Sequence, residues 1–279
     1  MIDSKEILAV GSIAFDSIET PKGNKNKIIG GSATYFGVAA SRYTKTSLIG
    51  VVGDDFKKND WSIFKRHNVN TESVHILKGN TFSWGGRYNH DYSHRETLFT
   101  ELGVFEDFEP VIHNNNRNQI LYLGNIQPQL QIDVINKVKS PYLIAADSMN
   151  LWIDLFPDKV WELISKVNIF MLNDEEAMQL TNKNDLNEIA NQLLDSGPKI
   201  VIIKKGAKGS LLAYENKKIN ISVAPNTEVV DPTGAGDSFA GGVLGYMSKI
   251  NTNNPVQAVI HGSAVASYTV SGFGLENLD

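Results

Sequence analysis

The chain contains no cysteine among its 279 residues. This excludes disulfide scaffolds, cysteine-ligated zinc, iron–sulfur clusters and thiol nucleophiles, and it favours a cytoplasmic protein. No stretch reaches the roughly 18 consecutive apolar residues of a membrane span. The N-terminal residues MIDSKEILAV also lack the basic-then-apolar order of a signal peptide. We therefore expect a protein without a membrane partner.

An excess of basic residues is missing too. Lys and Arg total 26 against 31 Asp and Glu, which gives a formal net charge of −5. Nucleic-acid-binding domains carry a basic surplus that neutralises phosphates, so we expect no nucleic-acid partner.

Several enzyme motifs are absent as well. No Gly-Lys dipeptide occurs, which excludes a Walker A loop, and no His is followed by Glu, which excludes a zincin helix. Phe239 stands where a dinucleotide fingerprint needs its third glycine. Ser238 is followed two residues later by Ala240 and not by Gly, so it is no nucleophile elbow.

Short β-branched apolar runs recur along the chain and alternate with amphipathic segments. The runs are Ile7 to Val10, Ser47 to Val52, Ile120 to Leu123, Tyr142 to Ala146, Asn168 to Leu172, and Ile200 to Ile203. The amphipathic segments are Lys57 to Arg66, Gln131 to Lys139, Lys159 to Lys166, and Asp185 to Leu194. Strands without inside/outside alternation are buried on both faces. The pattern predicts a three-layer α/β/α sandwich with a mostly parallel sheet, as a single domain over residues 1–279.

Two segments interrupt this rhythm. Residues 12–30 contain turn residues between short polar strands, and residues 80–103 alternate polar and aromatic residues, with Gly85-Gly86 as a candidate hairpin turn. Period-two alternation is typical of half-buried strands. We expect these two insertions to pair into a small β-lid at one edge of the main sheet.

The most informative string is DPTGAGDSFAGG, which starts at Asp231. Gly234, Ala235 and Gly236 precede an apolar helical run, so backbone N–H groups at a helix N-terminus would face outward and form an anion hole. Asp237 would stand beside that hole, where a carboxylate can take a proton from an attacking hydroxyl. An N-cap and a tight turn are the structural alternative, but the whole string favours phosphoryl transfer. The glycines later in this helix predict close approach to the sheet or to a ligand.

This string resembles the C-terminal signature of the ribokinase/PfkB family of sugar and nucleoside kinases. Three further motifs are similar to the family's, in its order: GGSATYFGVAASR from Gly30, preceded by Asp16; NDEE from Asn173; and KKGAKGS from Lys204. The resemblance implies a ribokinase-like fold and an ATP-dependent, Mg²⁺-requiring kinase. Its acceptor would be a hydroxymethyl group of a sugar or sugar-like small molecule.

The resemblance also implies roles for individual residues. Asp237 would be the general base. The substrate set is Asp16, Gly30, Gly31, Tyr35 and, from the lid, Arg87. Asn173 and Glu176 would organise Mg²⁺ through water. The residues expected to contact the nucleotide are Lys204, Gly206, Gly209, Ser267 and Gly272. Main-chain carbonyls of Asp231 and Thr233 would hold K⁺, as in part of the family.

Structural alternatives stand beside four of these assignments. NDEE is also an ordinary helix start, and Lys204 stands where several family members carry Thr, so a solvated lysine is the alternative there. Ser267 and Gly272 suit helix-on-sheet packing equally well. Arg87 suits a solvated face of the lid.

Tyr35 departs from the family pattern, since many sugar kinases carry a substrate-binding Asn there. A tyrosine offers one hydroxyl and a ring face, so the acceptor would differ from ribose or fructose. A nucleoside kinase and a non-catalytic nucleotide- or metabolite-binding regulator remain alternatives. Lids of this family often pair, which implies a homodimer. The chain ends soon after the expected adenine-site helix, so a longer form would continue with another helix.

Overall fold

The main body is built on a nine-stranded sheet. The computed structural model describes residues 5–113, 119–225, 227–249 and 254–279. The sheet strands are β1 (Ile7–Val10), β4 (Thr46–Gly53), β5 (Asn70–Leu77), β8 (Ile120–Leu123), β9 (Leu143–Asp147), β10 (Ile169–Asn173), β11 (Ile200–Lys204), β12 (Ser210–Tyr214) and β13 (Lys217–Ile221). Their order is β13-β12-β11-β10-β9-β8-β1-β4-β5.

Seven of these strands, from β5 to β11 in sheet order, run parallel, and β12 and β13 complete the sheet in antiparallel pairing. The apolar runs of the sequence form the buried centre of this sheet, as predicted, because parallel strands are covered on both faces.

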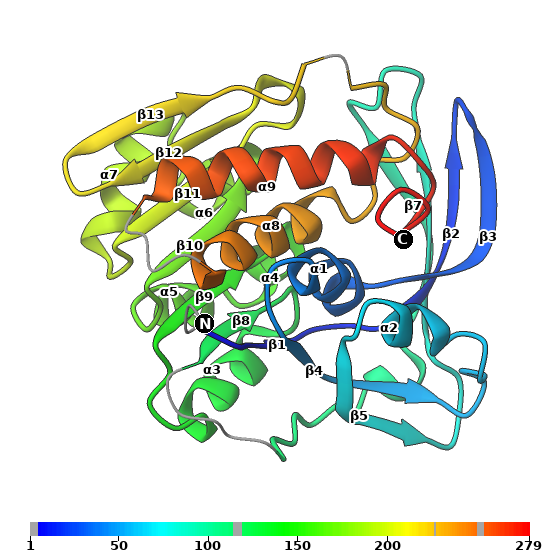
Figure 1. The fold of residues 1–279 in the computed structure, drawn as a ribbon. Coiled ribbons are helices and arrows are strands. Elements are labelled where there is room, and N and C mark those ends of the chain that lie inside the picture. The colour runs from blue at the N-terminus through cyan, green and yellow to red at the C-terminus, as the bar shows by residue number, and fades with distance from the viewer. Residues whose placement is uncertain (1–4, 114–118, 226, 250–253) are drawn as a thin grey trace.

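Helices cover both faces of the sheet (Figure 1). One face carries α1 (Ser32–Ser41), α2 (Ser62–Arg66), α8 (Ala235–Lys249) and α9 (Pro255–Val270). The other carries α3 (Pro128–Lys137), α4 (Asn150–Leu155), α5 (Pro157–Ile164), α6 (Asp174–Thr181) and α7 (Leu186–Asp195). Each face has its own buried apolar cluster. The three-layer prediction is thus confirmed.

One expected helix is shorter than predicted. The pattern from Lys57 to Arg66 predicts a continuous helix, but α2 begins only at Ser62. The Asp60 carboxylate accepts the Lys57 amide at 2.6 Å and closes a turn instead.

The glycines of α8 allow three helices to approach one another closely. A Cβ at Gly241 would lie 2.7 Å from the Phe36 carbonyl oxygen of α1, and one at Gly242 would lie 2.9 Å from the Gly262 Cα of α9. The close neighbours at these two positions are therefore helices, and not the sheet or a ligand as the sequence pattern predicts.

A separate four-stranded sheet, here called the lid sheet, stands at one edge of the body (Figure 1). It consists of β2 (Ala14–Thr20), β3 (Gly23–Gly30), β6 (Phe82–Tyr88) and β7 (Arg95–Glu101), in the order β3-β2-β6-β7. All four strands fall in the two segments that interrupt the α/β rhythm. The parallel pairing of β2 with β6 joins those two segments.

The hairpin turn of the second insertion differs from the prediction. Gly85 and Gly86 lie inside β6, and the chain turns between Asn89 and His94 instead. The two glycines make room for rings: a Cβ at Gly85 would overlap Phe99, and one at Gly86 would overlap Trp84. They are needed for packing and not for a turn.

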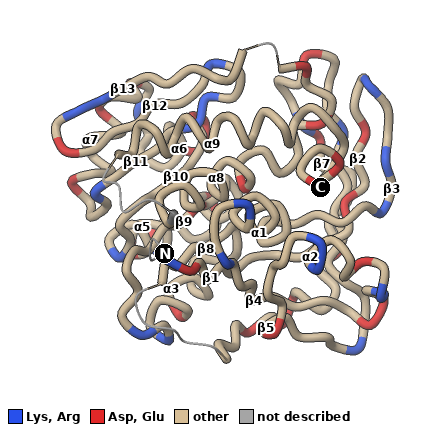
Figure 2. Tube along the Cα trace, in the orientation of Figure 1, with Lys and Arg blue, Asp and Glu red and all other residues tan. Residues whose placement is uncertain are grey.

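Ion pairs connect the lid sheet to the body. Lys22 pairs with Glu228 at 2.6 Å and Lys25 with Glu276 at 3.0 Å. Residues of both charges are interspersed over the described chain (Figure 2). In that part of the chain, no helix combines the length and apolarity needed to cross a bilayer.

Candidate active site

The N-terminus of α8 opens toward the lid sheet. Gly234 has φ +73°, a conformation that favours glycine, and it directs the chain into the helix. The Asp231 carboxylate stabilises this loop, because it accepts the Thr233 amide at 2.9 Å and the Gly274 amide at 3.0 Å. The first amides of a helix have no partners within the helix and carry its positive dipole end, and here the Ala235 amide donates to the Pro232 carbonyl of the preceding loop at 3.2 Å. The loop can therefore hold an anion.

The ring of Tyr35 packs against this loop. It lies so close to Gly234 that a Cβ there would overlap it. The side chain is only 1% exposed, and its hydroxyl has no hydrogen-bond partner in the described structure. Burial and the nearby Asp16 raise the pKa of this hydroxyl well above its usual value. Tyr35 thus offers an unpaired hydroxyl and not a ring face.

Asp237 stands in the first turn of α8 and is partly exposed. Burial by the surrounding protein raises its pKa to about 7, and the negative charge of Asp147 adds to the rise while Lys204 opposes it. A carboxylate with a pKa near neutrality can accept a proton from a hydroxyl and release it again at physiological pH. This is the property that a general base needs.

Three neighbouring parallel strands end at polar residues beside Asp237. Asp147 ends β9, Asn173 ends β10 and Lys204 ends β11. The Lys204 ammonium group lies 2.6 Å from the Asp147 carboxylate and 3.2 Å from where a Gly236 Cβ would be. Lys204 is therefore no solvated lysine, because its side chain is only 18% exposed and pairs with Asp147 next to the start of α8.

Asp147 is a residue that the sequence motifs did not single out. It is 4% exposed and holds both Lys204 and, through Oδ1, the Ser148 amide at 2.9 Å. Its one signal in the sequence is an acidic residue that closes an apolar run, LIAAD, at the carboxyl end of a parallel strand. Ligand sites of open α/β sheets gather at that edge.

Asn173 and Glu176 form a capping box at the start of α6. The Glu176 amide donates to the Asn173 side chain, and the Asn173 amide donates to the Glu176 carboxylate, both at 2.8 Å. The ordinary helix start that the sequence also allows for these residues is therefore present. Burial raises the pKa of Glu176 to about 7, while Lys204 lowers it and Asp147 raises it. Glu176 thus lies in the same charged group.

Asp16 comes to the site from β2 of the lid sheet. It packs against Gly30 so closely that a Cβ there would overlap its carboxylate, and Gly31 donates its amide to it. Asp16 is 3% exposed. Burial raises its pKa to about 7, helped by the negative charges of Asp231 and Asp237.

The two lid residues Tyr88 and Arg87 have different positions. The Tyr88 hydroxyl lies 3.0 Å from Thr233 Oγ1, at the anion-hole loop. Arg87 is next in the strand and therefore points to the opposite face. There it pairs with Glu19 at 2.6 Å and Glu96 at 3.6 Å, and it stays outside the group of site residues.

The other residues assigned to the nucleotide lie in two places. Gly206 and Gly209 lie between β11 and β12, whereas Ser267 lies in α9 and Gly272 just after it. Gly206 has φ +54° and open space around it, which leaves room for a ligand. Gly209 packs against the Ile221 carbonyl instead. Ser267 donates to the Ser263 carbonyl at 2.9 Å, and Gly272 packs beside Asn277. These contacts give Gly209, Ser267 and Gly272 structural partners.

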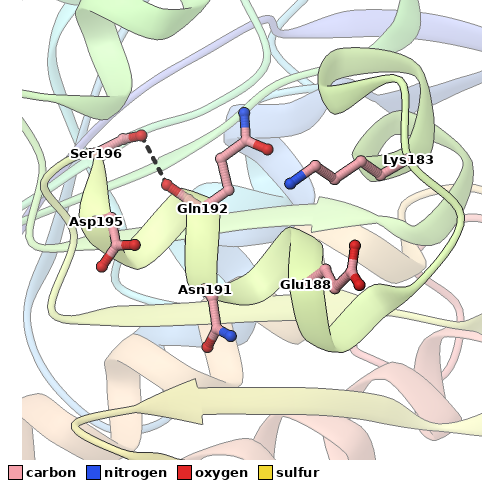
Figure 3. Close-up of a pocket in the computed structure, with 6 residues that line it drawn as sticks. All are labelled: Lys183, Glu188, Asn191, Gln192, Asp195 and Ser196. Atoms are coloured by element: carbon pink, nitrogen blue, oxygen red, sulfur yellow. Dashed lines mark hydrogen bonds between the residues drawn. The ribbon is translucent and has the colours of Figure 1, made fainter.

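A hollow elsewhere lies on the outer surface of α7 (Figure 3). It is lined by Lys183, Glu188, Asn191, Gln192, Asp195 and Ser196. It includes none of the candidate site residues that the sequence predicts.

The described residues contain no group of three or more carboxylate or histidine side chains placed to enclose a metal. Mg²⁺ does not require such a cage, because it usually keeps several waters and binds one or two carboxylates together with substrate phosphates. The neighbouring carboxylates of Asp147 and Glu176 meet that requirement.

Known proteins resemble this chain over nearly its whole length. The profile of the "pfkB family carbohydrate kinase" matches residues 4–278. The cytidine kinase of Thermococcus kodakarensis is 28% identical over 254 residues, covering 88% of this chain and 89% of that protein. The nucleoside kinase of Methanocaldococcus jannaschii is 23% identical over 285 residues, covering 98% and 92%.

Solved structures have the same fold. The crystal structure of the Methanocaldococcus jannaschii nucleoside kinase, a member of the ribokinase family, matches with a TM-score of 0.78 at 22% identity, covering 98% of this chain and 93% of that one. A Vibrio cholerae fructokinase with bound fructose, ADP and calcium matches with a TM-score of 0.79 at 20% identity, covering 99% and 96%. The fold is ribokinase-like.

Because the pKa of Asp16 is raised in the folded chain, we predict that the stability difference between wild type and Asp16→Asn depends on pH. Between about pH 4 and pH 7 the folded chain keeps a proton on Asp16 that the unfolded chain releases, so this contribution to stability is lost as pH rises. We expect Asp16→Asn to raise the free energy of unfolding at pH 8 by an amount on the order of 2–4 kcal/mol, and to change it little at pH 4. Urea unfolding at both pH values measures this.

Asp91→Asn is the matched control, because Asp91 is exposed and its pKa is lowered by Ser93. That variant should gain no stability at pH 8. A difference between Asp16→Asn and wild type that is the same at pH 4 and pH 8 would contradict the assignment.

Proposed function

Because the chain belongs to the pfkB family of carbohydrate kinases and is therefore a phosphotransferase, we propose that it transfers the γ-phosphoryl group of ATP to a hydroxymethyl group of a nucleoside or sugar-like acceptor. The observation that carries this proposal is the Asp237 carboxylate, with a pKa of about 7, at the open N-terminus of α8 and beside Lys204. A proton acceptor, backbone donors and a cation thus meet at one point.

Asp237 acts as the general base. It removes the proton of the acceptor hydroxymethyl group as the oxygen attacks the γ-phosphorus atom. The amides of Gly234, Ala235 and Gly236 then stabilise the charge on the transferring phosphoryl oxygens. The rigid contact between Gly234 and the Tyr35 ring keeps these amides aimed before the substrate arrives.

Lys204 and the two nearby carboxylates hold the phosphates of ATP. Asp147 and Glu176, with Asn173 through its cap on Glu176, would hold Mg²⁺ together with water. When bound, the ion would neutralise phosphate charge. Lys204 would contact the phosphates from the side of Gly236, and the open space at Gly206 would admit the nucleotide. Ser267 and Gly272 would flank the adenine ring, with Gly209 shaping the turn.

The acceptor is held from the lid side. Asp16, next to Gly30 and Gly31, accepts hydrogen bonds from acceptor hydroxyl groups, and Tyr35 adds its unpaired hydroxyl. Nucleosides are the class favoured by two of the curated relatives, a cytidine kinase and a nucleoside kinase. Sugars are the second class, supported by the fructokinase likeness. Main-chain carbonyls of Asp231 and Thr233 would bind K⁺.

The lid sheet also supports a homodimer. Strand β7 is an edge strand that is exposed along its whole length, and Leu98 and Phe99 on it are 38% and 37% exposed. Exposed edge strands pair readily with a second copy. We expect a particle of twice the 30.7 kDa chain mass in sedimentation equilibrium, and a monomer at every concentration tested would contradict this.

The experiment that tests the proposed function is an acceptor panel. ADP release is measured with Mg²⁺ and ATP against nucleosides and sugars, and we expect at least one acceptor to raise it far above background. Asp237→Asn should lower that rate by a factor of about 10³ or more while ATP binding changes little. Glu175→Gln, an exposed carboxylate in the first turn of α6, is the matched control and should keep full activity.

Substantial residual turnover by Asp237→Asn would contradict the role of the base. ATP binding without stimulation by any acceptor would favour a nucleotide-binding regulator instead.

A further inference from the structure

The lid hairpin carries two arginines with different surroundings. Arg87 on β6 pairs with two carboxylates. Arg95 on β7 is also exposed, yet no carboxylate within the described residues lies within ion-pairing distance of it. A guanidinium is always charged and geometrically suited to carboxylate or phosphate. Arg95 therefore has the capacity to bind an anion that the protein itself does not supply.

The pairing of β6 with β7 directs Arg95 toward the body. Arg95 lies directly opposite Tyr88, so both side chains project from the same face of the lid sheet. The Tyr88 hydroxyl reaches Thr233, one residue before Gly234. Arg87, next to Tyr88 in the strand, projects from the other face. Arg95 consequently projects from the face of the lid sheet on which Tyr88 contacts the loop before α8.

Trp84 helps to fix this position. The Arg95 guanidinium lies 5.3 Å from the centre of the Trp84 ring, within cation–π range. The indole in turn covers Gly86, which has no side chain to displace it. The guanidinium is thereby held above an apolar platform, beside the Tyr88 hydroxyl with which it shares a hydrogen bond.

The charge of Arg95 acts on two groups of the candidate site. Its positive charge lowers the pKa of Glu176 at the start of α6 and that of the Tyr88 hydroxyl beside Thr233. Arg95 is therefore close enough to influence a group at the start of α6 and a group at the loop before α8. The proposed function puts the phosphates of ATP at these two elements.

We propose that Arg95 is a catalytic residue by which the lid sheet contacts the transferring phosphoryl group. This inference rests on the proposed function. During transfer, the acceptor oxygen forms a bond to the γ-phosphorus atom, the bond from that atom to the β–γ bridging oxygen breaks, and the proton goes to Asp237. Arg95 keeps its own protons and donates hydrogen bonds to the phosphoryl oxygens as their charge changes. ADP leaves with the bond electrons.

The test compares Arg95→Ala, Arg95→Lys and the matched control Arg87→Ala with the best acceptor from the panel. We expect Arg95→Ala to lower kcat about 10²-fold or more, with little change in binding of a non-hydrolysable ATP analogue and in Tm. Arg95→Lys should keep part of the rate, and added guanidinium ion should restore part of it to Arg95→Ala. Arg87→Ala should stay within about twofold of wild type.

The outcomes separate this inference from its alternatives. If wild type phosphorylates no acceptor, the proposed function fails and this inference fails with it. If wild type is active and Arg95→Ala matches it, only the role of Arg95 is overturned. A loss confined to acidic acceptors would show that Arg95 binds a substituent of the acceptor, whereas the phosphoryl role predicts the loss with neutral acceptors too. A loss that guanidinium does not rescue and that accompanies a lowered Tm would overturn the role in favour of a structural one.

Discussion

The contact between Gly234 and the ring of Tyr35 is the constraint on which the candidate site depends. A positive φ and the absence of a side chain let the loop settle on a buried aromatic ring, and this fixes the start of α8. The Asp231 carboxylate holds the same loop to the C-terminal turn at Gly274. Backbone donors are thereby preorganised, so they need no reorganisation when charge develops on a phosphoryl group.

Around this fixed point the fold gathers charges that burial makes unfavourable. Burial raises the pKa values of Asp16, Glu176 and Asp237 to about 7, and the Lys204 ammonium group lies among these carboxylates and pairs with Asp147. Such a group lowers the stability of the empty protein at neutral and alkaline pH. Binding of a metal ion with its phosphates, or protonation of a carboxylate, would reduce this loss of stability. A kinase needs these same charged groups for its reaction, which is a reason for the site to keep them.

Much of this could be predicted from the sequence. The parallel sheet follows from apolar runs without alternation, and the tight loop at the start of α8 follows from small residues before an apolar helix. Asp147 could not be found in this way, because one acidic residue after a strand becomes meaningful only when Lys204 on a neighbouring strand approaches it. Which of Arg87 and Arg95 points toward the body depends on the register of β6 and β7. The sequence hides this register, because Gly85 and Gly86 resemble a hairpin turn but lie within β6.

The central claim is that Asp237, as a carboxylate with a pKa near neutrality, takes the acceptor proton at the start of α8. The most direct test is the pH dependence of kcat/KM for the acceptor at saturating ATP and Mg²⁺ between about pH 5.5 and 9. Because the base must be ionised, we predict a rise with pH through about 7 and then a plateau, and the residual rate of Asp237→Asn should lack this rise. A rate that is independent of pH in this range, or that falls as pH rises, would contradict the claim.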